Sequence, residues 1–242
     1  MTSSGYRLLA QGEGGLVVEL GDAVDPVVNA RVHEVAAAVR RKLEGDVLEI
    51  VPTYRSLLVL FDPLRVERAG LEARIEDLLS ELPVRRSRAA RRTLRVPVEY
   101  GGAYGPDLES VAAHAGLSAE QVVGIHASAS YLVYMLGFTP GFPYLGGMSE
   151  RISTPRLDSP RPRIPAGSVG IAGVQTGIYP VESPGGWRLV GRTPLRLFDP
   201  RRKNPFLLAA GDGVQFFEVD EPEWLDIERQ VNGGAYRPEW KS

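Results

Sequence analysis

The segment GFTPGFPYLGGM, residues 137–148, opens the part of the sequence that decides the fold. Between Gly137 and Leu197 the chain carries 11 glycines and 9 prolines. Proline removes a backbone donor and glycine weakens a helix, so a long helix cannot form in this region. Short strands joined by tight turns are the expected structure.

The first 82 residues differ from this region because their apolar residues recur at regular spacing. Residues 16–20 (LVVEL) predict a strand, and residues 28–43 carry Val or Leu at helical spacing. Two apolar runs, 47–51 and 57–61, flank the turn-like segment TYRS and predict a hairpin. A second apolar stripe over 71–82 predicts another helix. The order strand, helix, strand, strand, helix predicts a ferredoxin-like α+β domain.

The predicted domain boundaries follow changes in composition. The ferredoxin-like domain is expected over residues 1–84, and residues 83–95 contain six arginines and no acidic residue. We interpret residues 85–95 as an Arg-rich linker, and the alternative is a patch that binds an anion or a partner. A second domain is expected over residues 96–220. Residues 221–242 are acidic and are expected to form a C-terminal tail that docks on a partner.

Regular elements are also predicted at the start of the second domain. Residues 94–100 predict a strand, and a short helix is expected from Pro106. Ser118 and Gln121 form the pattern of a capping box, which marks the start of a further helix. Residues 131–138 (YLVYMLGF) return to strand character just before the Gly- and Pro-rich region.

The overall composition excludes several classes of protein. The 242 residues carry 28 Lys and Arg against 30 Asp and Glu, so no basic field attracts nucleic acid. The absence of cysteine excludes disulfides, zinc thiolates, iron–sulfur clusters and a cysteine nucleophile. No apolar run has the length of a membrane helix, and the start, MTSSGYRLLAQGEGG, lacks the pattern of a signal peptide. We therefore expect a cytoplasmic protein without membrane or nucleic-acid partners.

Common catalytic motifs are absent from the sequence. There is no G-x-x-x-x-G-K-[ST], no H-E-x-x-H and no G-x-S-x-G, which argues against a stand-alone NTPase of the usual kind. With three histidines in the chain, no metal site is expected.

His126 is the most informative of the three histidines, because it lies four residues after Val122 on the apolar side of its predicted helix. One interpretation makes it a general acid or base, or a hydrogen-bond donor to a substrate at the edge of a pocket. The other makes it a packed histidine near a helix C-terminus. Both interpretations remain open from the sequence.

The Gly- and Pro-rich region concentrates the groups that could recognise a small molecule. Phe138 lies in a loop that could offer aromatic walls and exposed backbone N–H groups. Arg161 and Arg163 are two residues apart, so they share one face of an extended chain and together suit a carboxylate or phosphate. The residues expected to act in catalysis are His126, Gln175, Thr176 and Tyr179, and those expected to bind substrate are Phe138, Arg161, Arg163 and Arg192. Structural roles in turns remain the alternative.

Long motifs in this region resemble a known protein family. They are GFTPGFPYLGGM, then TPR, PR and IPAGSVGIAG within residues 154–173, then QTGIYP, ESPGGWRLVGRTPL and FDP within residues 175–200. Residues 100–138 are similar to the same family, and the likeness covers most of residues 6–220. The family is the one called allophanate hydrolase subunit 1, the B-type subunit of 5-oxoprolinase, or sporulation-kinase inhibitor.

The resemblance implies a ferredoxin-like domain followed by a cyclophilin-like β-barrel. It also implies a subunit of an ATP-dependent 5-oxoprolinase, which opens 5-oxo-L-proline to L-glutamate. Activity would require a second cyclophilin-like subunit, of the kind called the C-type subunit of 5-oxoprolinase or allophanate hydrolase subunit 2, and a third 5-oxoprolinase subunit. ATP, with Mg, would then bind at a subunit interface.

Two other functions remain open within the same resemblance. One is a regulatory protein that binds a histidine kinase and blocks its autophosphorylation, which requires no catalytic group. The other is a subunit of carboxyltransferase or allophanate hydrolase type in urea metabolism. The chain shows neither a biotin-carrier lysine motif nor an amidase Ser-Ser-Lys signature.

Overall fold

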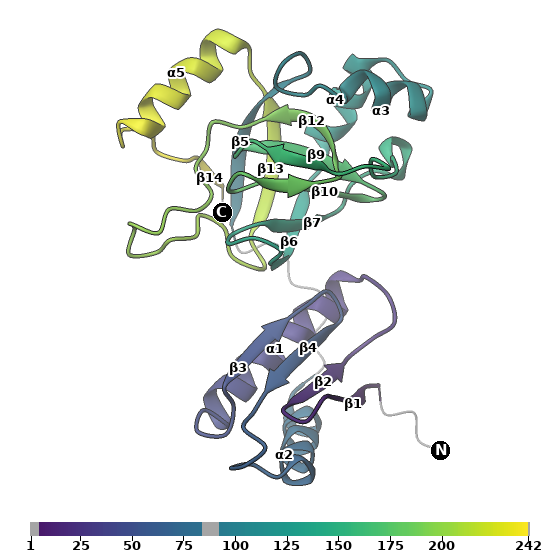
Figure 1. Cartoon of the computed structure of the whole chain (residues 1–242), viewed down its shortest axis with the longest axis vertical. Coiled ribbons are helices and arrows are strands. Elements are labelled where there is room, and N and C mark those ends of the chain that lie inside the picture. Colours follow the sequence, from purple (N-terminus) through teal and green to yellow (C-terminus); the bar gives the residue numbers. More distant parts are fainter. Residues whose placement is uncertain (1–4, 84–91, 242) are drawn as a thin grey trace. The chain divides into compact units, whose positions relative to one another are not determined.

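The computed structural model describes residues 5–83 and 92–241, which belong to two compact units, Met1–Ala89 and Ala90–Ser242 (Figure 1). Part of the predicted linker, residues 85–91, lies outside the described residues. The remainder is not a linker, because Thr93–Tyr100 forms a strand of the second unit. Arg92, just before this strand, forms a bidentate ion pair with Asp212 at 3.0 and 3.1 Å.

The first unit is a four-stranded antiparallel sheet with two helices. The sheet has the order β1-β2-β4-β3. Alternate residues of its strands and one face of each helix share a single buried core. The elements are β1 (Arg7–Gln11), β2 (Gly15–Glu19), α1 (Pro26–Lys42), β3 (Glu49–Pro52), β4 (Ser56–Leu60) and α2 (Arg68–Glu81).

Local sequence accounts for the predicted elements of this unit. The carboxylate of Asp25 accepts hydrogen bonds from the backbone N–H groups of Val27 and Val28, and Pro26 occupies the first turn of α1. The predicted hairpin is confirmed, because β3 and β4 are joined by a turn in which Thr53 N–H donates to Ser56 C=O at 2.7 Å. The α+β class is confirmed, whereas the ferredoxin-like assignment stays a prediction.

One edge strand of this sheet is absent from the elements that the sequence predicts. Strand β1 pairs with β2 over five residues, from Arg7 opposite Glu19 to Gln11 opposite Gly15. Its side chains are mostly exposed, so its sequence RLLAQ carries little of the alternation that marks a half-buried strand. Backbone pairing, rather than side-chain burial, holds this strand in place.

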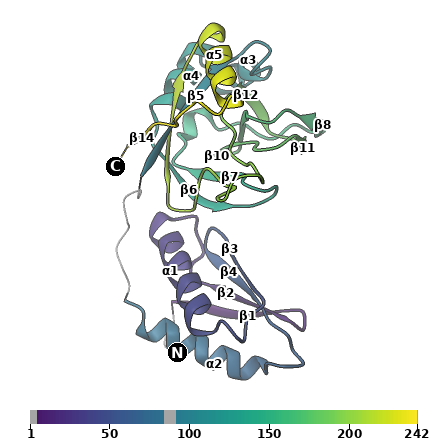
Figure 2. The same cartoon turned by 90° about the vertical axis from the view of Figure 1, so that its left-hand side faces the viewer.

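The second unit is built on a closed barrel of seven strands. The arrangement of its labelled strands can be followed in Figures 1 and 2. The order around the barrel is β12-β9-β10-β7-β6-β13-β5, and β5 pairs with β12 to close it. Strands β5 and β13 are parallel and the other barrel pairs are antiparallel. The barrel strands are β5 (Thr93–Tyr100), β6 (Tyr131–Leu136), β7 (Pro143–Gly146), β9 (Ser168–Ala172), β10 (Gln175–Ile178), β12 (Arg188–Arg192) and β13 (Gly213–Glu218).

Short elements surround this barrel. Helix α4 (Ala119–Ser128) packs on β13 and begins at the predicted capping box, in which both the Ser118 and Gln121 side chains bond to backbone N–H groups. Strands β8 (Arg161–Ile164) and β11 (Ser183–Gly185) pair as a separate two-stranded sheet on one side of the unit (Figure 2). The remaining elements are α3 (Leu108–Ala115), α4 (Ala119–Ser128), the short 3₁₀ helix η1 (Glu150–Ile152), α5 (Glu221–Asn232) and β14 (Trp240–Lys241).

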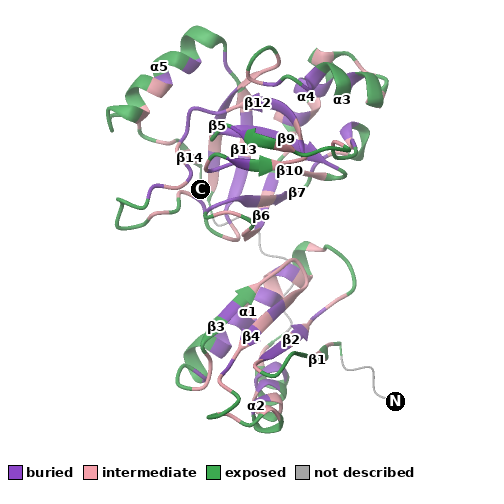
Figure 3. Cartoon of the chain, viewed as in Figure 1, coloured by how far each residue is buried: buried purple, intermediate pink, exposed green. Residues whose placement is uncertain are grey.

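The C-terminal segment is part of this unit and not the predicted tail. Helix α5 is exposed on most of its surface but buries Trp224 and Ile227 in the barrel's core cluster (Figure 3). The indole N–H of Trp224 donates to the carbonyl of Arg192 at 2.9 Å. Strand β14 then pairs with β5. Because Trp224 and Ile227 are three residues apart among polar residues, overall acidity conceals the amphipathic pattern.

We expect Trp224→Ala to reduce the free energy of unfolding of the second unit by about 3–5 kcal/mol, because it removes a 3% exposed side chain and its hydrogen bond. Urea denaturation of the purified chain measures this change. Leu225→Ala on the same helix is the matched control, since Leu225 is 43% exposed and should change stability little. Equal stability of both variants would mean that α5 does not belong to the core.

Candidate functional site

The candidate site is an aromatic pocket of about 300 Å³ on the second unit. Its lining combines rings from the loop before β7, from β7 itself, from the β10–β11 connection and from the residue just before β12. These segments are nearly 50 residues apart in the chain. The lining residues are Phe138, Phe142, Tyr144, Arg156, Pro160, Tyr179, Pro184, Gly185, Gly186 and Trp187.

Phe142 is the centre of the aromatic group. Its ring makes edge-to-face contacts with Tyr179 at 5.2 Å and Trp187 at 5.3 Å, and a tilted contact with Tyr144 at 5.1 Å. Gly177 on β10 leaves the space for this ring, since a Cβ there would lie 3.0 Å from two of its carbons. Such pairs fix ring positions through their quadrupoles, so the pocket floor is rigid.

Phe138 forms the rim of the pocket. It is the one non-glycine residue with positive φ in the described part of the chain, at 64°, and it is 65% exposed. A bulky residue avoids this left-handed conformation, and it persists where surrounding structure imposes it. The ring meets Phe142 edge-on at 5.8 Å, which places an exposed aromatic face beside the pocket opening.

Arg156 supplies the pocket's positive charge. It is exposed, and no carboxylate among the described residues forms an ion pair with it. Burial raises the pKa of Tyr144 and of Tyr179, and the nearby Arg156 charge opposes both shifts. Both tyrosines therefore stay protonated at neutral pH. A guanidinium of this kind beside aromatic walls suits a small planar molecule that carries a carboxylate.

The arginines predicted to bind substrate already have partners. Arg161 donates to the carboxylate of Asp107 at 2.8 Å, and Arg163 pairs with Glu182 at 2.7 Å. Arg192 donates to the carbonyl of Ala166 at 2.9 Å and lies over the ring of Trp224. None of the three lines the aromatic pocket, whereas Phe138 and Tyr179 of the predicted set do.

His126 lies inside the barrel, with no exposed surface. The Thr176 hydroxyl donates to Gly170 C=O at 3.0 Å, so its oxygen accepts from His126 Nε2–H at 2.9 Å. The Nδ1 atom of the neutral ring then accepts from the Tyr100 hydroxyl at 2.8 Å. The ring also stacks on Phe216, with centroids 4.6 Å apart.

This chain of hydrogen bonds satisfies every polar atom of the imidazole without a charge. Burial lowers the pKa of His126 to about 3. The structure thus places His126 away from the pocket edge where the sequence suggested it, and brings it together with Thr176, which is also fully buried. Gln175, the first residue of β10, precedes Thr176 on that strand and is partly buried.

Several residues of the pocket are absent from the predicted site. Arg156 is one of them, because spacing along the chain favours the Arg161–Arg163 pair as the carboxylate site. The signal that could have identified Arg156 is the motif TPR, which belongs to the family pattern. Tyr144 and Trp187 are far apart along the chain, and only the fold brings their rings together at 6.4 Å. Spacing in an extended chain does not show which guanidinium already has a carboxylate partner.

Metal-binding clusters and membrane-spanning helices are both absent from the described residues. Residues 5–83 and 92–241 hold no group of three or more His, Asp and Glu arranged to bind a metal ion. In the same ranges, no helix combines the length and apolar character needed to cross a membrane.

Comparison with known proteins gives consistent matches. Residues 6–208 match the family described as carboxyltransferase domain, subdomain C and D. The B-type subunit of 5-oxoprolinase from Bacillus subtilis is 43% identical over 236 residues, which is 94% of this chain and 98% of that protein.

Solved structures show the same fold. The crystal structure of TTHA0988 superposes with a TM-score of 0.74 and 42% identity, covering 86% of this chain but 40% of that longer chain. The urea amidolyase of K. lactis superposes with a TM-score of 0.81 at 22% identity, covering 98% of this chain and 16% of that one. This second likeness concerns the fold alone.

The buried imidazole predicts a pH dependence of stability. The unfolded chain binds a proton at His126 near pH 6.5, while the folded chain resists protonation until about pH 3. The His126 contribution is therefore complete above pH 6.5 and declines by about 1.4 kcal/mol for each pH unit below it.

Urea unfolding of wild type and of His126→Asn at pH 7, 6 and 5 gives the free energy of unfolding of each protein at each pH. The difference between the two slopes of this free energy against pH measures the His126 contribution. Parallel slopes would contradict the assignment. Should the variant fail to fold, NMR of the wild-type ring provides the test, and its signals should not titrate between pH 8 and 5.

Proposed function

The chain belongs to the family of carboxyltransferase domains, subdomain C and D, and on this premise we propose that it is the B-type subunit of an ATP-dependent 5-oxoprolinase. The observation that carries the proposal is the match to the B. subtilis 5-oxoprolinase protein along nearly the full length of both chains. The pocket geometry adds support, because its size and groups suit 5-oxo-L-proline.

The substrate offers a flat lactam ring and one carboxylate. In the proposed pose the lactam lies against the rings of Phe142 and Trp187, while the carboxylate meets Arg156. The Tyr179 hydroxyl remains protonated and can donate a hydrogen bond to the lactam oxygen. Phe138 at the rim would limit the entry of water.

The reaction requires activation, because a lactam carbonyl is a poor electrophile. Transfer of the γ-phosphoryl group from ATP to the lactam oxygen releases ADP and converts that oxygen into a leaving group. Water then adds to the activated carbonyl carbon and the C–N bond breaks, which frees the amine and leaves an acyl phosphate. A second water hydrolyses this acyl phosphate to glutamate and phosphate. Positioning and charge stabilisation dominate such transfers.

Partner subunits are part of this proposal. The sequence holds no P-loop, and the described residues of the pocket include no carboxylate that could act as a general base. We assign the completion of the catalytic site to a second cyclophilin-like subunit and a third 5-oxoprolinase subunit, with Mg and ATP at an interface. The cyclophilin-like description of this barrel and the ferredoxin-like description of the first unit belong to the same proposal, as does a cytoplasmic location.

Carboxyl transfer in urea metabolism is the second candidate function. It is favoured by the carboxyltransferase description of the matched family and by the fold shared with urea amidolyase. Both reactions can be assayed on one preparation of the complex, with 5-oxoproline and ATP in one assay and urea with a carboxybiotin donor in the other. Urea-dependent turnover without 5-oxoproline-dependent turnover would select the second candidate. Histidine-kinase inhibition stays a prediction from the sequence.

We expect the purified chain to show no 5-oxoproline-dependent release of ADP, and the reconstituted complex to show it. The physical reason is that this chain supplies a binding pocket without a nucleotide motif or a catalytic base. Coupled detection of ADP with and without the partner subunits makes the comparison. Turnover by this polypeptide alone would contradict the assignment.

Within the complex, Arg156→Ala should raise the KM for 5-oxoproline about tenfold or more, because it removes a charge-assisted hydrogen bond to the carboxylate. Arg163→Ala is the matched control, since that guanidinium is held by Glu182. Its KM should stay within about twofold of wild type, with both melting temperatures unchanged. The opposite ranking would return the carboxylate site to Arg163.

A further inference from the structure

A second pocket of the same unit has a different chemical character. It encloses about 370 Å³ between the end of β12, the last turn of α5 and the C-terminal segment. Figure 2 shows β14, which forms part of its wall, on the side of the unit opposite to β8 and β11. Its lining residues are Leu195, Arg196, Arg202, Leu207, Val231, Gly234, Tyr236, Arg237, Pro238 and Trp240.

The lining carries three guanidinium groups and no carboxylate. Nearby, Asp199 is 8% exposed in its side chain and is shared by Arg196, Arg201 and Arg202. Arg201 occupies both of its carboxylate oxygens, at 2.9 and 3.0 Å, while Arg202 lies 3.7 Å away. One carboxylate thus faces three guanidiniums, and the donors of Arg202 remain available to a ligand.

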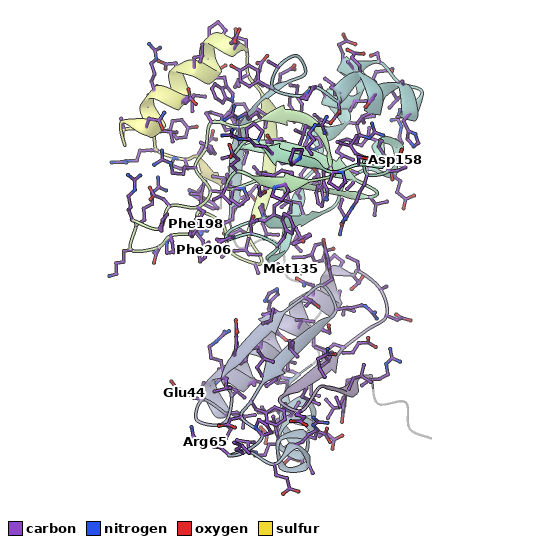
Figure 4. All side chains as sticks on the ribbon, in the orientation of Figure 1. Glu44, Arg65, Met135, Asp158, Phe198 and Phe206 are labelled. Atoms are coloured by element: carbon purple, nitrogen blue, oxygen red, sulfur yellow. The ribbon has the colours of Figure 1, made fainter. Side chains whose placement is uncertain are left out.

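The loop between Phe198 and Phe206, which carries Arg201 and Arg202, is fixed by contacts at its base. Phe198 and Phe206 pair at its base with ring centroids 5.3 Å apart, and Figure 4 shows the two side by side. Asp199 N–H donates to Pro205 C=O at 2.8 Å, and Arg201 N–H donates to the Asp199 carboxylate. Arg202, which lines the pocket, donates its backbone N–H to Asp199 C=O at 3.1 Å. The loop is therefore ordered before any ligand arrives, which lowers the entropy cost of binding.

The opposite wall is apolar and aromatic. Leu195, Leu207 and Val231 pack against the barrel core, and Tyr236 and Trp240 add partly buried rings. The guanidinium of Arg92 covers one face of the Trp240 ring at 3.9 Å. No described residue hydrogen-bonds the Tyr236 hydroxyl, so it is available as a donor.

We propose that this pocket is the part of the interface nucleotide site that this chain supplies, and that it binds a nucleoside triphosphate with the phosphates on Arg202 and Arg237 and the base against Tyr236 and Trp240. A single carboxylate would leave most of the positive charge unmatched, whereas a polyphosphate matches it and offers several oxygens to the planar guanidiniums. The flat apolar wall suits the base at the other end of the same ligand. The choice of a triphosphate rests on the proposed ATP-coupled reaction.

Calorimetry on the full chain tests the proposal with four probes: Mg-ATP, ATP without Mg, inorganic tripolyphosphate and adenosine. We expect ATP to bind most tightly, tripolyphosphate more weakly and adenosine weakest, because the charges and the rings contribute together. Arg202→Ala and Arg237→Ala should each weaken ATP binding about tenfold, and the double variant further. Their melting temperatures should match wild type, since both residues are exposed.

Arg229→Ala is the matched control, because it removes the same charge from α5, where Arg229 pairs with Asp226 away from this lining. It should bind ATP within about twofold of wild type. Arg156→Ala should also bind ATP normally. The 5-oxoproline assignment is tested by the KM of the complex for 5-oxoproline, and the nucleotide assignment by the affinity of this chain for ATP. Failure of one assignment therefore leaves the result for the other unchanged.

Two outcomes would overturn the proposal. One is the absence of measurable ATP binding at millimolar concentration. The other is unchanged ATP binding by the double variant. If that variant also failed to assemble with the partner subunits, the arginines would instead form a surface for an acidic protein segment.

Discussion

The pairing of β5 with both β13 and β12 is the constraint on which the second unit depends. Strand β5 lies parallel to β13 over six residue pairs and contacts β12 at Gly191 and Arg192, which closes the barrel. Gly191 is required at this seam, because a Cβ would lie 2.6 Å from a methyl of Val98 and 2.7 Å from Glu99 C=O. Closure removes free edges and holds the ends of the strands, and therefore the pocket loops, at fixed separations.

The interior of this barrel contains an uncharged polar relay instead of a purely apolar core. Tyr100, His126, Thr176 and the carbonyl of Gly170 link β5, α4, β10 and β9 through hydrogen bonds that leave no ring nitrogen unsatisfied. A buried polar group without partners would destabilise the fold, whereas a complete network specifies one arrangement of its elements. His126 thus ties α4 to β10, the strand whose Gly177 leaves room for the Phe142 ring.

Two pockets of different chemistry then share one scaffold. The first combines aromatic rings with Arg156, and the second combines three arginines with an apolar wall. In the proposed reaction these groups would hold its two ligands, a small planar carboxylate and a polyphosphate. The described residues of the two linings supply no general base, which gives partner subunits a defined chemical role in the proposed reaction.

The sequence by itself determined the elements whose signals are local. The Gly- and Pro-rich region forms short strands, the Asp25 and Ser118 caps start helices, and the motifs of residues 137–200 identify the family. The tertiary structure decided the rest, because pairing across long separations leaves little local signal. It placed β13 beside β5, turned the acidic segment at residues 221–232 into a helix anchored by Trp224, and buried His126. It also gave carboxylate partners to Arg161 and Arg163 and, among the described residues, none to Arg156, since ion pairing depends on distances in space that spacing along the chain does not contain.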